Sequence, residues 1–207
     1  MNITDEAIQG CDRFIGIVSE EKRNRLKAYN FSVDKALSLY AELLVRWQVS
    51  RILDISQADI FFVQNEFGKP FLQGYSDFHF NVSHTRNAIA VAFSNSPIDI
   101  DVERVRSFDL KIARRYFMPQ ELDYILQASN QDYASYEIWT KKEAYIKYLG
   151  KGLSIPLTSF NVLDNKISSI MNTKEQCKYI ISVCGGSVTE DALIQHVNPL
   201  EFEMWWK

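Results

Sequence analysis

The stretch Ile-Asp-Ile-Asp-Val-Glu, residues 98–103, alternates apolar and acidic side chains without a break. Successive side chains of a β-strand point to opposite faces of the sheet. The three apolar residues are therefore expected to face the core. The three acidic residues then line the other face at neighbouring positions, at Asp99, Asp101 and Glu103. The pattern predicts a strand with one apolar and one strongly acidic face.

Three like charges at neighbouring positions of one sheet face repel one another, so something must offset them. Water would suffice if the strand were amphipathic and half-solvated. A divalent cation is the second interpretation, because Mg2+ binds carboxylate oxygens together with waters and substrate phosphates. The strand alone does not separate these interpretations.

Around this strand, the periodicity of the chain predicts an α+β fold. Apolar residues at three- and four-residue steps predict helices over 33–52 and 135–149. A helical stretch over 109–127 contains Pro119, which can start a new helix, and Ser19 or Glu20 can open another. Strands are expected at 60–63, 78–83, 88–94, 98–102, 160–163 and 179–183. This order predicts two α+β halves, 1–104 and 105–207.

Composition narrows the classes of function. The chain has 207 residues, 46% hydrophobic and 24% charged, with a net charge of −3. No overall basic field is available to hold nucleic acid or a membrane surface, so neither is expected as a partner. The three cysteines have no zinc-binding spacing, and no apolar run is long enough for a signal peptide or a membrane span. We therefore expect a cytoplasmic protein.

The predicted helix over 135–149 carries a second acidic candidate. Trp139, Glu143, Ile146 and Lys147 are neighbours at helical spacing. An acid beside Trp and Ile is partly desolvated, which raises its pKa towards that of a general base. The alternative is an ordinary Glu143–Lys147 ion pair on a solvated helix face.

Several polar residues could bind a phosphate. Ser83 and His84 end a predicted strand, Lys69 lies in a turn, and Lys22 and Arg25 belong to a short basic run. Each could equally be an ordinary surface residue. Glycine-rich phosphate-binding loops are absent from the sequence, so a phosphate would be bound by side chains and a metal ion.

The order of these motifs carries more information than any one of them. It runs through Gly68-Lys69-Pro70, Phe80-Asn81-Val82-Ser83-His84, Ile100-Asp101-Val102-Glu103, and Trp139 with Lys142-Glu143-Ala144 and Lys147. The series resembles the 4'-phosphopantetheinyl transferases of the surfactin-synthetase-activating type. The resemblance covers about residues 15–163.

The resemblance implies an α+β pseudo-dimer of two similar halves in one chain, with coenzyme A in the cleft between them. It implies a monomeric enzyme that depends on Mg2+, with Mn2+ as the alternative ion. The enzyme would move the phosphopantetheine arm of coenzyme A to a serine of an apo acyl or peptidyl carrier protein. Adenosine 3',5'-bisphosphate would be released.

The resemblance also implies roles for individual residues. The catalytic residues would be Glu143, His84 and Lys147. The metal ligands would be Asp101, Glu103 and Glu143. Coenzyme A would be bound by Lys22, Arg25, Lys69, Pro70, Ser83, His84, Lys142 and Lys147. The carrier protein would dock near residues 111–117.

Two positions depart from the family pattern: Asp99 stands where glycine is usual, and Leu37 stands where a basic residue is frequent. Two other functions remain open from the sequence. One is a Mg2+-dependent nucleotide phosphohydrolase or nucleotidyl transferase, which would explain the carboxylates. The other is a non-catalytic module that binds coenzyme A.

Overall fold

The chain forms two compact units in a computed structural model, which describes residues 1–66, 68–150, 155–186, 194–198, 202 and 204–206. The first unit contains Met1–Phe61, Val82–Val91 and Leu193–Lys207, and the second contains Phe62–Asn81 and Ala92–Ala192. The predicted halves were continuous segments of the chain. The observed units alternate along the sequence, because part of a β-hairpin and the C-terminal segment group with the N-terminal helices.

The first unit is built around one long helix. Its helical elements are α1 (Asp5–Gly10), η1 (Cys11–Ile17), α2 (Glu20–Lys27), α3 (Ser32–Leu53) and η2 (Gln57–Asp59). The side chain of Ser19 accepts a hydrogen bond from the Lys22 amide and caps α2. The ring of Tyr40, in the middle of α3, is fully buried and contacts Phe14 and Phe202. The observed α3 confirms the helix predicted over 33–52.

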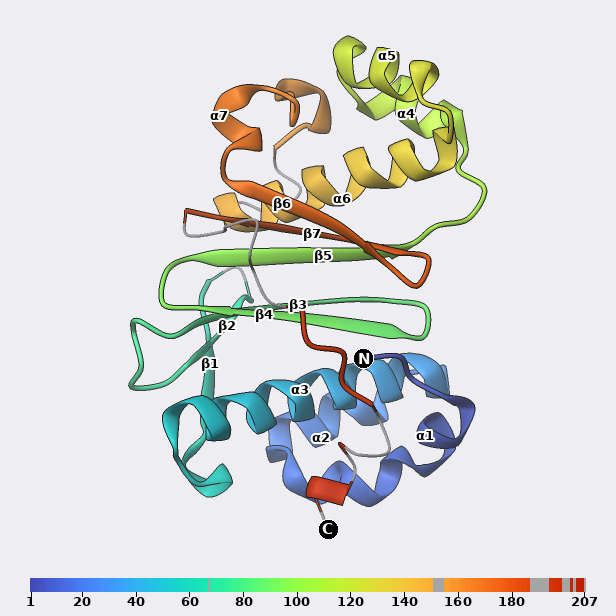
Figure 1. The fold of residues 1–207 in the computed structure, drawn as a ribbon. Helices are drawn as coiled ribbons and strands as arrows, with labels where there is room; N and C mark the ends of the chain where they lie inside the picture. Colours follow the sequence, from blue (N-terminus) through green and yellow to red (C-terminus); the bar gives the residue numbers. More distant parts are fainter. Residues whose placement is uncertain (67, 151–154, 187–193, 199–201, 203, 207) are drawn as a thin grey trace. The chain divides into compact units, whose positions relative to one another are not determined.

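The second unit contains an antiparallel sheet with the order β5-β7-β6, formed by β5 (Ile98–Arg104), β6 (Met171–Gln176) and β7 (Tyr179–Gly185). Its helices are α4 (Leu110–Tyr116), α5 (Pro119–Gln127), α6 (Gln131–Leu149), η4 (Leu157–Ser159) and α7 (Asn165–Ser168). Figure 1 shows α6 lying along this sheet. Pro119 starts α5 as predicted, and Gly150 ends α6 in a left-handed conformation with φ 66°. The sequence also predicts a helix cap at Gly152, a residue that lies outside the described ranges.

Two short hairpins complete the strands. β1 (Phe62–Gln64) pairs antiparallel with β2 (Pro70–Leu72), and β3 (His79–Thr85) forms a two-stranded sheet with β4 (Ala88–Ser94). The predicted strands over 60–63, 78–83 and 88–94 correspond to β1, β3 and β4. The mixture of helices and strands confirms the predicted α+β class. No helix in the described ranges is both long and apolar enough to cross a bilayer.

The late strands were predicted only in part. The expected strand over 160–163 is wrong: no strand is assigned there, and the Val162 amide donates to the Glu121 carboxylate at 2.8 Å instead of to a neighbouring strand. The strand β6 was missed because its sequence, Met-Asn-Thr-Lys-Glu-Gln, is mostly polar. It forms the edge of the sheet, where a strand needs little apolar surface.

The thiols should differ sharply in reactivity. Cys177 is exposed, whereas Cys11 and Cys184 are buried. Burial raises the pKa of both buried thiols, that of Cys184 to about 12, and only a thiolate reacts readily with an alkylating agent. We expect iodoacetamide to modify Cys177 alone in the native protein and all three cysteines in urea, as measured by peptide mass spectrometry. Rapid native labelling of Cys184 would contradict the described packing.

Candidate active site

The acidic face of β5 is the face that α6 covers. Asp101 is the antiparallel partner of Ser182 in β7, so their side chains share one face of the sheet. The Ser182 hydroxyl lies 2.7 Å from the hydroxyl of Thr140 in α6. Asp99 and Glu103 lie two residues to either side of Asp101 and hence on the same face. The predicted alternation is confirmed, but Asp99 and Asp101 are buried under the helix rather than half-solvated.

Glu143 of α6 belongs to this acidic group. It follows Thr140 by three residues, which places both on one side of the helix. Burial is the main cause that raises the pKa of Glu143, and the negative charges of Asp101 and Glu103 raise it further. The charge of Lys147 opposes this effect. Glu143 therefore lies within electrostatic range of both carboxylates.

Lys147 is one of the cations that contact this face. Its ammonium donates to Asp101 Oδ1 at 2.7 Å and to the Ile100 carbonyl at 3.0 Å. The expected alternative was an ion pair between Lys147 and Glu143 on a solvated surface. The contact with Asp101 instead ties the last turns of α6 to the middle of β5.

The donor chemistry of the group suits a hard cation, because Mg2+ prefers carboxylate oxygens. After burial, the negative charges of Asp101 and Glu103 raise the pKa of Glu143, and a bound divalent ion would offset this repulsion. Within the described part of the chain, no three His, Cys, Asp or Glu side chains are already gathered in a group that could hold a metal.

Lys142 occupies a different environment from its neighbours. Its side chain has no exposed surface and forms an ion pair with the equally buried Glu121 of α5 at 2.8 Å. The ammonium also donates to the carbonyls of Leu157 and Phe160. This burial argues against the expected contact between Lys142 and the pyrophosphate of coenzyme A, because the ammonium would have to leave all of these partners.

Lys69 and Pro70 lie at the β1–β2 turn. The Lys69 ammonium pairs with Asp99 Oδ2 at 2.6 Å, while the adjoining Pro70 is exposed. The expectation that Lys69 is an ordinary surface lysine is therefore incomplete, because its ammonium reaches a buried carboxylate of β5. Asp99 is one of the two residues that depart from the family pattern. It is buried, and its charge is paired with that of Lys69.

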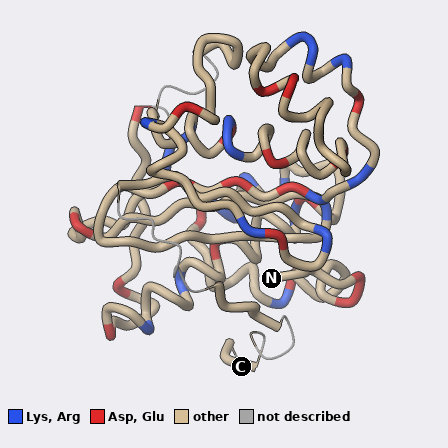
Figure 2. The backbone as a smooth tube through the Cα atoms, turned by 45° about the horizontal axis from the view of Figure 1, so that its top comes forward, with Lys and Arg blue, Asp and Glu red and all other residues tan. Residues whose placement is uncertain are grey.

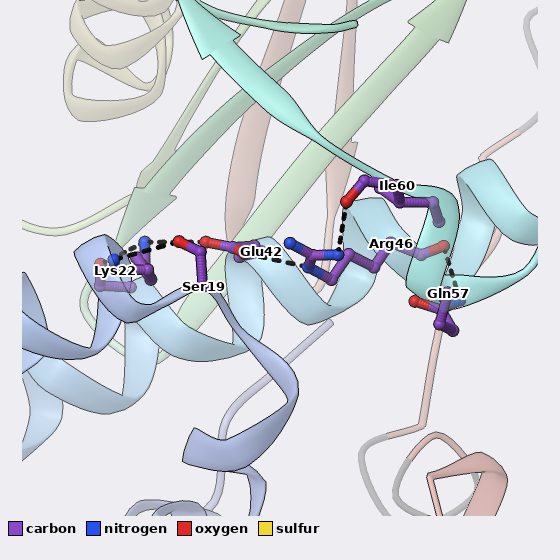
Figure 3. A network of polar contacts seen from close by, with 7 residues as sticks. Ser19, Lys22, Glu42, Arg46, Gln57 and Ile60 are labelled. Carbon is purple, nitrogen blue, oxygen red and sulfur yellow. Dashed lines mark hydrogen bonds and ion pairs between the residues drawn. The ribbon is translucent and has the colours of Figure 1, made fainter.

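Lys22 and Arg25 belong to the basic run of the first unit. Lys22 belongs to the polar network shown in Figure 3. The Lys22 ammonium donates to Ser38 Oγ at 3.0 Å and lies 3.7 Å from Glu42, which accepts from Arg46. Burial lowers the pKa of Lys22, and the charge of Glu42 opposes this shift. Arg25, on the next turn of α2, is exposed. Leu37 is buried in the core of the unit and offers no cation.

Ser83 and His84 lie near the end of β3, as predicted. Ser83 is buried and His84 is exposed, so the two consecutive side chains point to different sides of the strand. Both belong to the part of the hairpin that groups with the first unit.

Comparison with known proteins identifies the family. Residues 97–194 match the model of the 4'-phosphopantetheinyl transferase superfamily, and residues 9–96 match that of the 4'-phosphopantetheinyl transferase N-terminal domain. A 4'-phosphopantetheinyl transferase, gsp, of Aneurinibacillus migulanus is 39% identical over 163 residues, which are 76% of this chain and 68% of the relative. The transferase Sfp of Bacillus subtilis is 37% identical over 153 residues, 73% of this chain and 68% of the relative. The chain belongs to the Sfp-type 4'-phosphopantetheinyl transferases.

Membership of this family makes the chain a transferase that acts on carrier proteins, with coenzyme A as its co-substrate. A fungal relative, the L-aminoadipate-semialdehyde dehydrogenase-phosphopantetheinyl transferase of Schizosaccharomyces pombe, is 27% identical over 177 residues, 76% of this chain and 69% of the relative. The acidic face of β5 lies inside the superfamily match, and α2 and α3 lie inside the N-terminal match. The transferase therefore has all its predicted site residues within matched segments.

The segment expected to dock the carrier protein is α4 of the transferase. Lys111, Arg114 and Arg115 are exposed along it, whereas Ala113 and Phe117 are buried and anchor it. Figure 2 shows acidic and basic segments scattered along a mostly uncharged tube, so a local cluster such as this one, rather than net charge, must supply any basic surface.

Sequence reasoning missed Glu121, which gave no signal beyond its place in the first turn of α5. It named Asp99 but not its partner, because Lys69 lies thirty residues away in the sequence. A pocket in the first unit contains none of the predicted site residues. Its lining comes from Trp47, Arg51, Gln195, His196, Val197, Asn198, Phe202 and Trp205.

Proposed function

We propose that this transferase moves the 4'-phosphopantetheine of coenzyme A to the serine hydroxyl of an apo acyl or peptidyl carrier protein, with Mg2+, and releases adenosine 3',5'-bisphosphate. The observation that carries the proposal is the electrostatic coupling of Glu143 to Asp101 and Glu103 on a face that also holds Lys147. Phosphoryl transfer is mostly positioning and charge neutralisation, and this face supplies groups for both.

Asp101, Glu103 and Glu143 are the residues that would hold Mg2+. Bound there, the ion would neutralise negative charge on the oxygens of the coenzyme A diphosphate. The ion would also offset the repulsion among the carboxylates, which otherwise raises the pKa of Glu143.

The chain's own residues handle the proton and the phosphate charge. Glu143 accepts the proton of the carrier serine, directly or through one water, because burial, the main cause that raises its pKa, makes its carboxylate a stronger base than an exposed one. The serine oxygen forms a bond to the β-phosphorus, and the bond from that phosphorus to the bridging oxygen breaks. The departing bisphosphate takes the electron pair. Lys147 brings its positive charge to the phosphate oxygens while Asp101 holds the ammonium.

The remaining predicted residues are assigned to coenzyme A. Ser83 and His84 are proposed for the pyrophosphate, with His84 assisting catalysis there, and Lys69 and Pro70 for the adenine. Lys22 and Arg25 are proposed for the adenosine 3'-phosphate. Lys142 is omitted because its ammonium is enclosed by Glu121 and two carbonyls.

Docking of the carrier protein is proposed along α4, where Lys111, Arg114 and Arg115 are exposed. Such a surface suits an acidic partner, since complementary charge accelerates association and selects the partner. We also expect a monomer, which light scattering at micromolar concentration would test.

The decisive experiment incubates the full chain with coenzyme A, Mg2+ and an apo carrier protein, followed by intact mass spectrometry. The expected result is the mass gain of one phosphopantetheine, located on the carrier serine and absent from a serine-to-alanine carrier. Release of free phosphopantetheine or phosphate without any modified carrier would instead indicate the nucleotide phosphohydrolase. Binding of coenzyme A without transfer would indicate the non-catalytic module.

The assignment of Lys22 predicts a selective loss of affinity. Lys22→Met should raise the KM for coenzyme A roughly tenfold, as expected for the loss of one charge-assisted hydrogen bond. It should change the KM for dephospho-coenzyme A, which lacks the 3'-phosphate, much less. Lys27→Met is the matched control, because Lys27 lies on the same helix and bonds only to exposed Asn24. Equal losses with both substrates would contradict the assignment.

A further inference from the structure

Asp99 is an acidic residue buried at the start of β5. The whole residue has 0% exposure, and Oδ2 accepts from the Lys69 ammonium at 2.6 Å. The other oxygen, Oδ1, is buried and has no hydrogen-bond partner among the described residues. A buried carboxylate is costly unless a cation contacts it. Lys69 is therefore needed at this position by Asp99 itself, independently of any substrate.

Among the described residues, no second cation is in direct contact with the Asp99 carboxylate. Cys184, its antiparallel partner in β7, has a pKa raised to about 12 and is a neutral thiol. Lys147 and His79 act on Asp99 only through longer-range charge. Burial raises the pKa of Asp99, and Lys69 is the first of the groups that oppose this. The negative charge of Asp99 is thus offset chiefly by Lys69.

Hydrogen bonds fix both the backbone and the side chain of Lys69. Its amide donates to Asn65 Oδ1 at 2.9 Å, and its carbonyl accepts from the Asn65 amide at 3.1 Å, which fixes its backbone in the turn. Gly68 precedes it with φ 78°, a conformation that suits glycine. The side chain then reaches Asp99, yet it keeps 33% exposure. An ammonium has three N–H donors, so the contact with Asp99 leaves others for an acceptor atom on the exposed side.

From this geometry we propose that Asp99 is a positioning residue for coenzyme A: it holds the Lys69 ammonium in one place, so that another of its N–H groups can donate to a ring nitrogen of the adenine. The proposal rests on the proposed function and deepens it. An untethered lysine loses side-chain entropy when it binds a ligand, whereas this lysine has lost that entropy already. Asp99 acts on the substrate only through Lys69.

The test is a double-mutant cycle on the full chain with Asp99→Asn, Lys69→Met and both together. The KM for coenzyme A and kcat are measured by carrier modification, and the Kd for coenzyme A by calorimetry. Asp99→Asn should raise KM and Kd on the order of fivefold with kcat changed less than about twofold, and Lys69→Met roughly tenfold. The double variant should resemble Lys69→Met alone. Asp77→Asn removes an exposed carboxylate of the same unit and should change neither constant.

Stability gives an independent check of the pair. Lys69→Met strands the buried carboxylate, so its melting temperature should fall, and adding Asp99→Asn should restore much of the loss. If Lys69→Met does not fold, Lys69→Arg replaces it and should lose less affinity in the native background than in the Asp99→Asn background.

Two results would overturn the inference: an unchanged KM and Kd in Asp99→Asn, or an effect of Asp99→Asn that is equally large when Lys69 is absent. A native protein that binds coenzyme A but modifies no carrier would instead overturn the proposed function, and the calorimetric cycle would still decide the role of Asp99.

Discussion

Replacing Glu143 with glutamine is expected to lower kcat for carrier modification by roughly 10²–10⁴-fold, the usual contribution of a general base. Glutamine keeps the shape and the position on α6 but cannot accept the serine proton. It also removes one of three carboxylates proposed to hold Mg2+. Binding of coenzyme A in the absence of metal should change little, because the lost step is proton transfer and not the capture of the substrate.

The matched control for this variant is Glu137→Gln. Glu137 lies on the same helix and pairs with Lys141 at 2.6 Å, away from the acidic residues of β5. Single-turnover transfer should be normal in this control, and both variants should unfold near the native temperature. Turnover of Glu143→Gln within a few fold of native would remove Glu143 from the mechanism, even if metal binding were weakened.

Replacing Lys142 with methionine is expected to destabilise the protein by about 3–5 kcal/mol, the cost of leaving one partner of a buried ion pair uncompensated. Glu121 would remain buried without its cation, and the carbonyls of Leu157 and Phe160 would lose their donor. Whole domains are stable by only about 5–15 kcal/mol, so the loss is a large part of the total. Urea unfolding followed by circular dichroism measures it.

Two further variants make this prediction specific. Lys141→Met, one residue earlier, breaks the i,i+4 pair of Lys141 and Glu137, whose side chains keep 17% and 15% exposure, and should cost about 0.3–0.5 kcal/mol. Adding Glu121→Gln to Lys142→Met should restore part of the stability, because it removes the stranded charge while keeping an oxygen for the Val162 amide. Equal costs for Lys141→Met and Lys142→Met would show that the buried pair is not a main support of the unit.

The local patterns of this chain were strong enough to predict most elements. Apolar spacing predicted α3 and α6, and the alternation of residues 98–103 predicted β5 and its acidic face, because helix and strand periodicities act within a few residues. Segments with weak local patterns were predicted poorly. The polar edge strand β6 was missed, and the apolar stretch at 160–163 was taken for a strand although the Val162 amide bonds to Glu121.

The sequence by itself determined the α+β class, the family and the acidic residues that gather on one strand face, since the periodicity within each element and the order of short motifs are both present in the chain itself. Only the tertiary structure decided which charges pair. Lys142 and Lys147 lie five residues apart on α6, yet one is enclosed with Glu121 and the other contacts Asp101. Lys69 likewise pairs with Asp99, thirty residues away in the sequence. The energy of a buried charge depends on its solvation and on partners distant in sequence, so no local pattern records it.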